Sequence, residues 1–278
     1  KMRFWNIGAE GQILVGGCAT AGFMIYFGGT FPTPVLLILM AVVSLAAGAV
    51  WGIIPALFKS RWGTNETLFT LMMNYVAIQI TSYCVALWEN PVGSNTVGVI
   101  NQRTKAGWFP ELFGQDYGLN VLIVGILTVG MFLYLKYTKQ GYEIAVVGES
   151  QNTARYAGIK LSRVFIRTMA ISGAICGLAG FIAVAGAGHT ISTSTAGGRG
   201  FTAIIVAWLA KFNTFVMVVI SFLLVFLEKG AIQIASQFKL NDFASNVITG
   251  IILFCIIGSE FFIQYRLIFR GRKEAGQA

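Results

Sequence analysis

Long apolar blocks separated by short polar breaks run through the whole sequence. The blocks cover residues 7–27, 35–58, 68–87, 119–134, 168–187 and 243–262. An α-helix rises about 1.5 Å per residue, so about 20 apolar residues cross the roughly 30 Å hydrocarbon core of a bilayer. The pattern predicts an all-α fold, a polytopic transmembrane helical bundle with six long spans.

Another apolar stretch, residues 201–227, is interrupted by the polar run at residues 211–213. If this stretch were one span, the basic C-terminal end would lie outside the cell. That placement contradicts the rule that Lys and Arg are more frequent in cytoplasmic segments. We therefore predict a pair of short helices, residues 201–210 and 215–227, that form a hairpin on the cytoplasmic side. Helices this short must be shielded by protein, which is tolerated where they line a cavity.

The distribution of charge predicts which side of the membrane each segment occupies. Residues 137–167 hold the largest basic cluster and the C-terminal end is also basic, so we expect both in the cytoplasm. Residues 89–118 are rich in Gly, Asn and Pro and carry few cations, which indicates an outside loop. The net charge of +9 follows from this anchoring, and no basic stripe with interleaved aromatic residues indicates nucleic-acid binding.

Composition favours a membrane protein without catalytic chemistry of its own. Hydrophobic residues make up 56% of the chain and charged residues only 11%, well below the roughly 25% charged residues of soluble domains. The sequence contains no phosphate-binding loop, so any ATP must be hydrolysed by a partner. The four cysteines lie one per apolar block and His189 is the single histidine, so we expect no metal site, no cofactor and no enzyme activity.

Gly173 and Gly177 form a G-x-x-x-G pair in the fifth block, and Gly180 follows. Small residues at this spacing let two membrane helices approach closely. We expect a close helix contact on this face, which by itself says little about function.

The basic segment 137–167 contains a short stretch with both helix ends marked. Ser150 can cap a helix over residues 151–157, and Gly158 suits the left-handed residue at which helices often end. One interpretation is a juxtamembrane loop that only sets topology. The other is a coupling element through which a cytoplasmic partner acts on the membrane part.

Four sequence segments resemble a known family. They read N-I-G-A-E-G-Q at residues 6–12, T-N-E-T-L-F-T-L-M-M-N-Y at 64–75, A-R-Y-A-G-I at 154–159 and G-R-G-F-T-A-I at 198–204. In this order and on a matching topology, they resemble the membrane permease subunits of bacterial ABC importers for branched-chain amino acids, simple sugars and nucleosides. The nucleoside-type permeases are the most similar.

The resemblance implies a single multi-pass permease domain over residues 1–278, embedded in the lipid of the bacterial plasma (inner) membrane. It implies a second permease subunit, identical or different, together with two cytoplasmic ATP-binding subunits and an extracytoplasmic solute-binding protein. Family members usually have further N-terminal helices, so we expect the chain to be truncated or reduced there. They also often have Asn-Pro where this chain has Ser150 and Gln151, which leaves the start of the coupling helix open.

The coupling helix of that family corresponds to ten residues of this chain. They are Glu149, Ser150, Gln151, Asn152, Thr153, Ala154, Arg155, Tyr156, Ala157 and Gly158. Ala154 and Ala157 lie three apart on a helix and share a face, so we expect them to allow close docking of an ATP-binding subunit. Arg155 and Tyr156 would then anchor the contact on either side.

Five polar residues are candidates for a solute pathway, because polar groups inside apolar blocks are costly in lipid. They are Asn6, Glu10, Gln12, Glu66 and Asn74. We expect Glu10 to face a protein-lined interior. A purely structural interpretation stays open for each, since Asn6 and Glu66 can cap helices and Asn74 can bond a neighbouring helix. The lack of a charged cluster in mid-membrane suits a neutral solute such as a nucleoside or a sugar.

Two other classes of function stay open. An ion-coupled secondary transporter would also use broken helices, but it should show carboxylates near mid-membrane and inverted repeats, and neither is evident. A membrane scaffold subunit would need no pathway at all.

Overall fold

The structure is a computed structural model that describes residues 2, 4–112 and 114–239 with residues 247, 250, 251, 254, 255, 258 and 259. Within this part the regular elements are helices, and one isolated β-bridge joins Leu112 and Gln115. The chain divides into two compact units, residues 1–204 and 205–278. Most of the predicted span at residues 243–262 lies outside the described residues.

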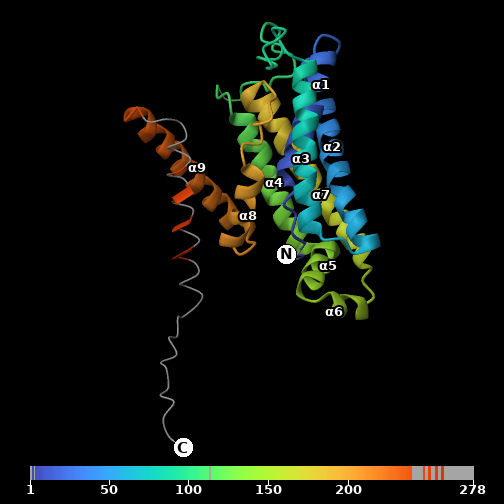
Figure 1. Cartoon of the computed structure of the whole chain (residues 1–278). Helices are drawn as coiled ribbons and strands as arrows, with labels where there is room; N and C mark the ends of the chain where they lie inside the picture. The colour runs from blue at the N-terminus through green and yellow to red at the C-terminus, as the bar shows by residue number, and fades with distance from the viewer. Residues whose placement is uncertain are drawn as a thin grey trace, which may run out of the picture. The chain divides into compact units, whose positions relative to one another are not determined.

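The helices of the first unit follow one another with mostly short connections, and the exceptions are residues 88–117 and 189–198 (Figure 1). They are α1 (Ala9–Phe27), α2 (Thr33–Trp62), α3 (Glu66–Leu87), α4 (Gly118–Tyr137), α5 (Lys139–Glu149), α6 (Gln151–Tyr156), α7 (Leu161–Phe181) and the π-helix η1 (Ile182–Gly188). The next helix, α8 (Arg199–Leu209), begins in the first unit and ends in the second, which also contains α9 (Thr214–Gln237).

In the part of the chain that the structure describes, five helical segments are long and apolar enough to cross a membrane: α2, α3, α4, α7 with η1, and α9. The 19-residue α1 is not among them, because Glu10 and Gln12 lower its hydropathy. The predicted count of six long spans plus a hairpin of short helices is therefore not confirmed.

The predicted break at residues 211–213 is present, because α8 ends before it and the side chain of Asn213 caps the start of α9. The predicted short second helix, residues 215–227, is wrong, since α9 has 24 residues. Glu228 and Lys229 do not end the helix, because both are good helix formers and no proline follows them.

Helix α1 packs against α2, α3 and α7, and glycines bring α1, α2 and α7 close together. A Cβ added at Gly48 would lie under 3.0 Å from backbone atoms of Gly173 and Gly177, and one at Gly16 would meet Gly177 in the same way. Membrane helices associate through such close van der Waals contact at small residues. The predicted close packing at Gly173, Gly177 and Gly180 is confirmed.

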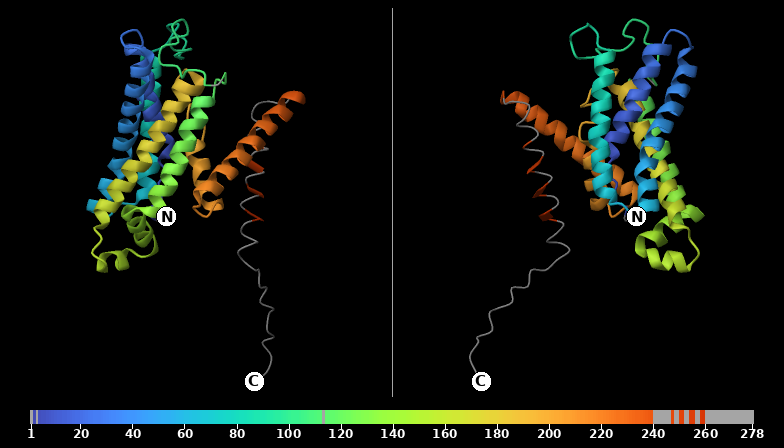
Figure 2. Two further views of the ribbon diagram at one scale, coloured as in Figure 1. Left: turned by 180° about the vertical axis from the view of Figure 1, so that it is seen from behind. Right: turned by 45° about the vertical axis from the view of Figure 1, so that its right-hand side comes forward.

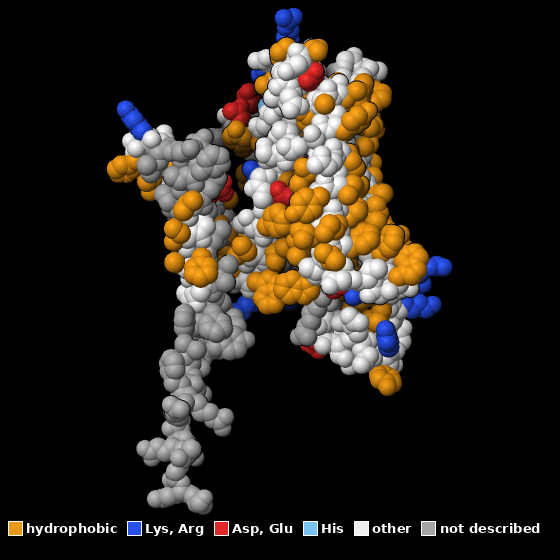
Figure 3. Space-filling model, in the orientation of Figure 1, with side chains coloured by type: hydrophobic (Ala, Val, Ile, Leu, Met, Phe, Trp, Pro, Cys, Tyr) orange, Lys and Arg blue, Asp and Glu red, His pale blue; other side chains and the backbone are white. Residues whose placement is uncertain are grey.

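Polar connections lie at the two ends of the first unit. Residues 89–117 lie at one end, and α5 and α6 lie at the other, next to the start of α7 (Figure 2). Hydrophobic side chains cover the lateral faces of the helices, and Lys and Arg gather toward the ends (Figure 3). This distribution is the one that a helical membrane protein requires.

Substituting Gly177 by leucine should destabilise the first unit, because its backbone contacts leave no room for a side chain. Overpacking typically costs about 1 to 3 kcal/mol. The matched control is Gly125→Leu on α4, where an added Cβ meets nothing within 4 Å. We expect the thermal unfolding temperature of the detergent-solubilised protein to fall for Gly177→Leu and not for Gly125→Leu. Equal temperatures for both variants would show that the glycine contacts do not limit stability.

Candidate functional site

The carboxylate of Glu10 connects the first turn of α1 to the start of α8. Its Oε1 accepts a hydrogen bond from the Gly198 N–H at 2.7 Å, and its Oε2 accepts one from the Gly200 N–H at 2.8 Å. Glu10 is only 8% exposed. The first N–H groups of a helix have no partner inside the helix and carry partial positive charge, so a carboxylate is stabilised there.

Glycines at residues 197–200 make this approach possible. Gly197 and Gly198 have φ angles of 59° and 75°, in the left-handed region that favours glycine. A Cβ at Gly200 would lie 2.8 Å from the Cα of Glu10. The G-G-R-G sequence thus brings the start of α8 close enough for both hydrogen bonds.

Gln12 and Asn6 form a second polar contact beside Glu10. The Gln12 Nε2 donates to the Asn6 Oδ1 at 3.4 Å, and the Asn6 Nδ2 donates to the Gln12 Oε1 at 3.3 Å and to the Ser172 Oγ at 3.5 Å. The Asn6 Oδ1 also accepts from the Gly8 N–H at 3.0 Å. Asn6 therefore holds the entry into α1 and links it to α7, although the N-cap residue of α1 is Gly8 and not Asn6.

Asn74 joins α3 to the same part of α1. Its Oδ1 accepts from the Gly11 N–H and its Nδ2 donates to the Ile7 carbonyl, each at 2.9 Å. Asn74 is the ninth residue of α3, so this contact lies about 12 Å along the helix from its start. The polar group around Glu10 consequently lies inside the bundle and not at its end.

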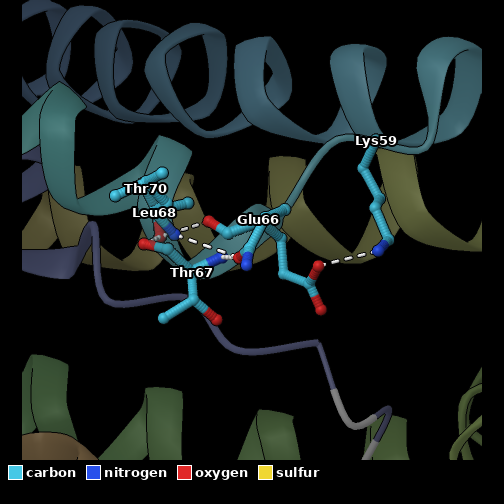
Figure 4. A network of polar contacts seen from close by, with 6 residues as sticks. Lys59, Glu66, Thr67, Leu68 and Thr70 are labelled. Atoms are coloured by element: carbon cyan, nitrogen blue, oxygen red, sulfur yellow. Dashed lines mark hydrogen bonds and ion pairs between the residues drawn. The ribbon is translucent and has the colours of Figure 1, made fainter.

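Glu66 lies apart from this group, at the connection between α2 and α3 (Figure 4). Its carboxylate forms an ion pair with the Lys59 Nζ at 2.8 Å, and the Asn65 side chain caps α3 through the N–H groups of Thr67 and Leu68. Partly exposed ion pairs of this kind contribute about 0 to 1 kcal/mol. The structure brings Asn6, Glu10, Gln12 and Asn74 together and leaves Glu66 outside.

An irregular segment, residues 189–198, runs between η1 and α8 along the side of α1. Ile191 belongs to the same hydrophobic cluster as Cys18, and Ala196 packs with Ile13 and Leu14. The segment therefore follows α1 from its middle back to Glu10. Inside a membrane, irregular backbone is tolerated where protein buries it or where it lines a water-filled cavity.

The irregular segment carries a run of hydroxyl groups that sequence reasoning missed. The Ser192 Oγ lies 3.0 Å from the Ser194 Oγ and 3.3 Å from the Thr195 Oγ1, and Thr193 and Ser194 are exposed. The signal for this site was the sequence S-T-S-T-A-G-G at residues 192–198, just before an apolar helix. Such hydroxyls can donate and accept hydrogen bonds without carrying charge.

The beginning of the irregular segment is held by the connection between α3 and α4. The Ile100 N–H donates to the His189 carbonyl at 2.8 Å, and the Phe109 N–H donates to the Ala185 carbonyl at 3.1 Å. The His189 ring stacks on Trp108 with ring centroids 3.7 Å apart. Burial lowers the pKa of His189, which favours the neutral ring.

The predicted short helix in the basic segment is confirmed as α6. The Ser150 hydroxyl caps it by accepting from the Thr153 N–H at 3.2 Å, and Gly158 has a φ of 77°. The prediction that Ala154 lies on the docking face is wrong, because Ala154 is fully buried against α5 and α7. The exposed side of α6 carries Tyr156, which is 94% exposed.

The first unit holds α5 and α7 together by one ion pair as well as by apolar packing. The Arg167 Nη2 lies 2.9 Å from the Glu143 Oε2. Ala154 packs into the cluster that contains Ile144 and Val164. Helix α6 is therefore fixed to the start of α7.

Within the described part of the chain, no group of three or more His, Cys, Asp or Glu side chains could hold a metal ion.

Comparisons with known proteins extend over nearly the whole chain. The family model described as "Branched-chain amino acid transport system / permease component" matches residues 1–257. A glucose ABC transporter permease protein of Haloferax volcanii is 30% identical over 96% of this chain and 72% of its own length. A guanosine ABC transporter permease protein of Bacillus subtilis is 30% identical over 93% of this chain and 75% of its own length. A nucleoside ABC transporter permease protein of Lactococcus lactis is 27% identical over 66% of this chain and 52% of its own length. No solved structure matches the chain.

Substituting Glu10 by glutamine should destabilise the contact between α1 and α8. Glutamine keeps one acceptor oxygen, but it places an NH₂ group against the second N–H and removes the charge that strengthens both bonds. Losing a charge-assisted hydrogen bond costs about 1.5 to 3 kcal/mol.

Thermal unfolding of the purified protein measures this effect, with Glu66→Gln as the matched control because its ion pair is partly exposed. We expect the unfolding temperature of Glu10→Gln to fall clearly below that of Glu66→Gln. Equal values would mean that the Glu10 carboxylate adds no more stability than a surface charge.

Proposed function

The chain belongs to the family of branched-chain amino acid transport system permease components, and we propose that it forms the membrane pathway of an ATP-driven importer for a neutral solute. The solute class is a nucleoside or a simple sugar, as the names of the glucose, guanosine and nucleoside permeases suggest. The observation that carries the proposal is the irregular, hydroxyl-bearing segment at residues 189–198, held against α1 by Glu10.

Glu10, Gln12, Asn6 and Asn74 build the wall of this pathway. Glu10 fixes the start of α8, and the three amide side chains fix the entry into α1. Discontinuous helices whose ends meet inside the membrane are a common way for transporters to place polar groups along a pathway. Glu66 supports the wall indirectly, through its ion pair between α2 and α3.

A neutral solute fits the charges of this region. Among the described residues, Glu10 is the charged side chain that lies buried, and both of its oxygens already accept backbone hydrogen bonds. The buried groups around Glu10 offer a charged solute no free counter-charge, and Arg199 at the start of α8 is exposed. Hydroxyl groups at residues 192–195 suit the hydroxyl-rich surface of a sugar or of a ribose.

The alternative functions are less well supported. An ion-coupled secondary transporter needs a carboxylate that binds and releases an ion, whereas the Glu10 oxygens are engaged with α8. A scaffold subunit would not need an irregular, hydroxyl-bearing segment inside its bundle. Membership in the permease family favours transport over both.

Helix α6 and its flanks, residues 149–158, dock on a cytoplasmic ATP-binding subunit. The docking surface consists of exposed residues: Glu149, Gln151, Asn152, Thr153, Arg155, Tyr156, Ala157 and Gly158. Ser150 and Ala154 instead hold the helix in place, through the cap and through burial. Because α6 is fixed to the start of α7, a movement of α6 on its ATP-binding partner moves α7 with it.

The importer contains further subunits. A second permease subunit completes the pathway, two ATP-binding subunits lie on the side of residues 137–167, and an extracytoplasmic solute-binding protein contacts the side of residues 89–118. This arrangement places the basic segment and the C-terminus in the cytoplasm of a bacterial cell. It also makes the chain a multi-pass protein of the inner membrane.

Substituting Tyr156 by alanine should uncouple ATP hydrolysis from transport, because interfaces depend on a few aromatic and arginine anchors. The measurement is solute-stimulated ATP hydrolysis and uptake of guanosine and of glucose in vesicles that contain the full importer. A loss of about 1 to 2 kcal/mol at the contact corresponds to a decrease of roughly 5- to 30-fold.

The control is Ile126→Ala, which shortens an exposed side chain in the middle of α4, outside both proposed docking surfaces. Insertion and binding of the solute-binding protein should stay normal in both variants. Unchanged hydrolysis and uptake in Tyr156→Ala would reduce α6 to a loop that sets topology. Ala154→Trp is a poorer test, because it would disrupt the packing of the buried Ala154.

A further inference from the structure

The exposed face of α3 carries polar side chains deep within the length of the helix. Tyr75, Gln79, Ser82 and Tyr83 are spaced by four, three and one residues, so they share one face. Tyr75 is 60% and Tyr83 is 71% exposed. Among the residues that the structure describes, the polar atoms of these four side chains form no hydrogen bond.

The exposed faces of α2 and α4 offer a direct comparison. Both faces consist of large apolar side chains at the positions that point away from the bundle. These are Val35, Ile38, Val42 and Val50 on α2, and Val121, Val124, Ile126 and Val129 on α4. Such faces suit lipid. The exposed side of α3 also carries apolar residues such as Met72 and Val76, but it adds the four polar side chains to them.

The position of the polar face within α3 excludes lipid as its normal neighbour. Gln79 is about 20 Å from the start of α3 and about 12 Å from its end, so its amide cannot easily reach water beyond the bilayer. Amide and hydroxyl groups without hydrogen-bond partners are costly in hydrocarbon. The polar face of α3 must therefore meet water, solute or protein.

Helix α3, which carries the polar face, and the irregular segment that the proposed function uses both pack on α1. The opposite face of α3 packs on α1 through Asn74, Ala77 and Thr81. Ile78, at the border between the two faces, packs against the cluster of Ile13, Leu14 and Ala196. The exposed groups of α3 and of residues 192–195 thus flank the same helix, α1.

We propose that Tyr75, Gln79, Ser82 and Tyr83 contact the solute in transit, and that they favour a neutral solute with a planar ring, such as a nucleoside. This inference rests on the proposed function. Tyrosine rings offer flat surfaces on which a base stacks, and the Gln79 amide can both donate to and accept from the edge of a base. Residues 67–88 contain no charged residue, so this face of α3 carries no charge that would favour an ionised solute over a neutral one.

Accessibility to a membrane-impermeant methanethiosulfonate reagent tests the proposal in the reconstituted importer. Single cysteines at Gln79 and Ser82 are compared with Ile38→Cys and Ile126→Cys, in a chain whose four native cysteines are replaced. We expect labelling at both α3 positions to be at least about tenfold faster than at the two controls, and guanosine to slow it more than glucose does. Labelling as slow as at the controls would overturn the proposal.

Uptake by a second pair of variants separates solute contact from contact between subunits. Gln79→Leu should raise the KM for guanosine by about tenfold and change the KM for glucose much less, whereas Ile126→Ala should change neither. Equal changes for both solutes, or disulfide formation between Ser82→Cys chains without reagent access, would show that the face contacts a second subunit. A wild-type importer that moves neither solute would contradict the proposed function itself, whereas wild-type uptake with an unaltered Gln79→Leu variant contradicts the α3 proposal alone.

Discussion

A carboxylate inside an apolar helix bundle needs hydrogen-bond donors, and the placement of the polar elements in this protein depends on how Glu10 obtains them. Its two oxygens accept the N–H groups of Gly198 and Gly200, which the start of α8 cannot satisfy internally. The carboxylate and the two N–H groups would each be costly to bury without a hydrogen-bond partner, and these two bonds remove that cost for both sides. The interaction fixes where the chain returns along α1, and so it places the hydroxyl groups of residues 192–195 beside this helix.

Close helix packing supplies the frame for that interaction. Glycines at the contacts of α1, α2 and α7 let these backbones touch, and Gly200 extends the same principle to α8. The amides of Asn6 and Asn74 then hold the entry into α1 against α7 and α3. At the opposite end from the α3–α4 connection, the Arg167–Glu143 ion pair and the burial of Ala154 fix α6 to the membrane helices. One rigid frame therefore includes both the proposed pathway and the proposed coupling surface.

Hydrophobic blocks and helix caps carried most of what the sequence could predict. They indicated α2, α3, α4 and α7, the short helix after Ser150, and the break before Asn213, because these features depend on neighbouring residues. The length of α9 was wrong, since adjacent charges at Glu228 and Lys229 look like a boundary although both residues favour helix. The prediction that Ala154 faces a partner subunit was also wrong, because the sequence of a six-residue helix covers too few turns to show which face is buried. The partners of Glu10 could not be predicted, as Gly200 lies 190 positions away.

Hydrogen–deuterium exchange of the backbone amides of Gly198 and Gly200 tests the central claim most directly. Mass spectrometry of peptides that cover residues 189–204 compares the wild-type chain with Glu10→Gln, and peptides from α2 serve as the internal reference. We expect slow exchange in the wild-type protein and clearly faster exchange in Glu10→Gln, with no change in α2. Exchange of the 189–204 peptides at the same rate in both proteins would contradict the claim that the Glu10 carboxylate holds the start of α8.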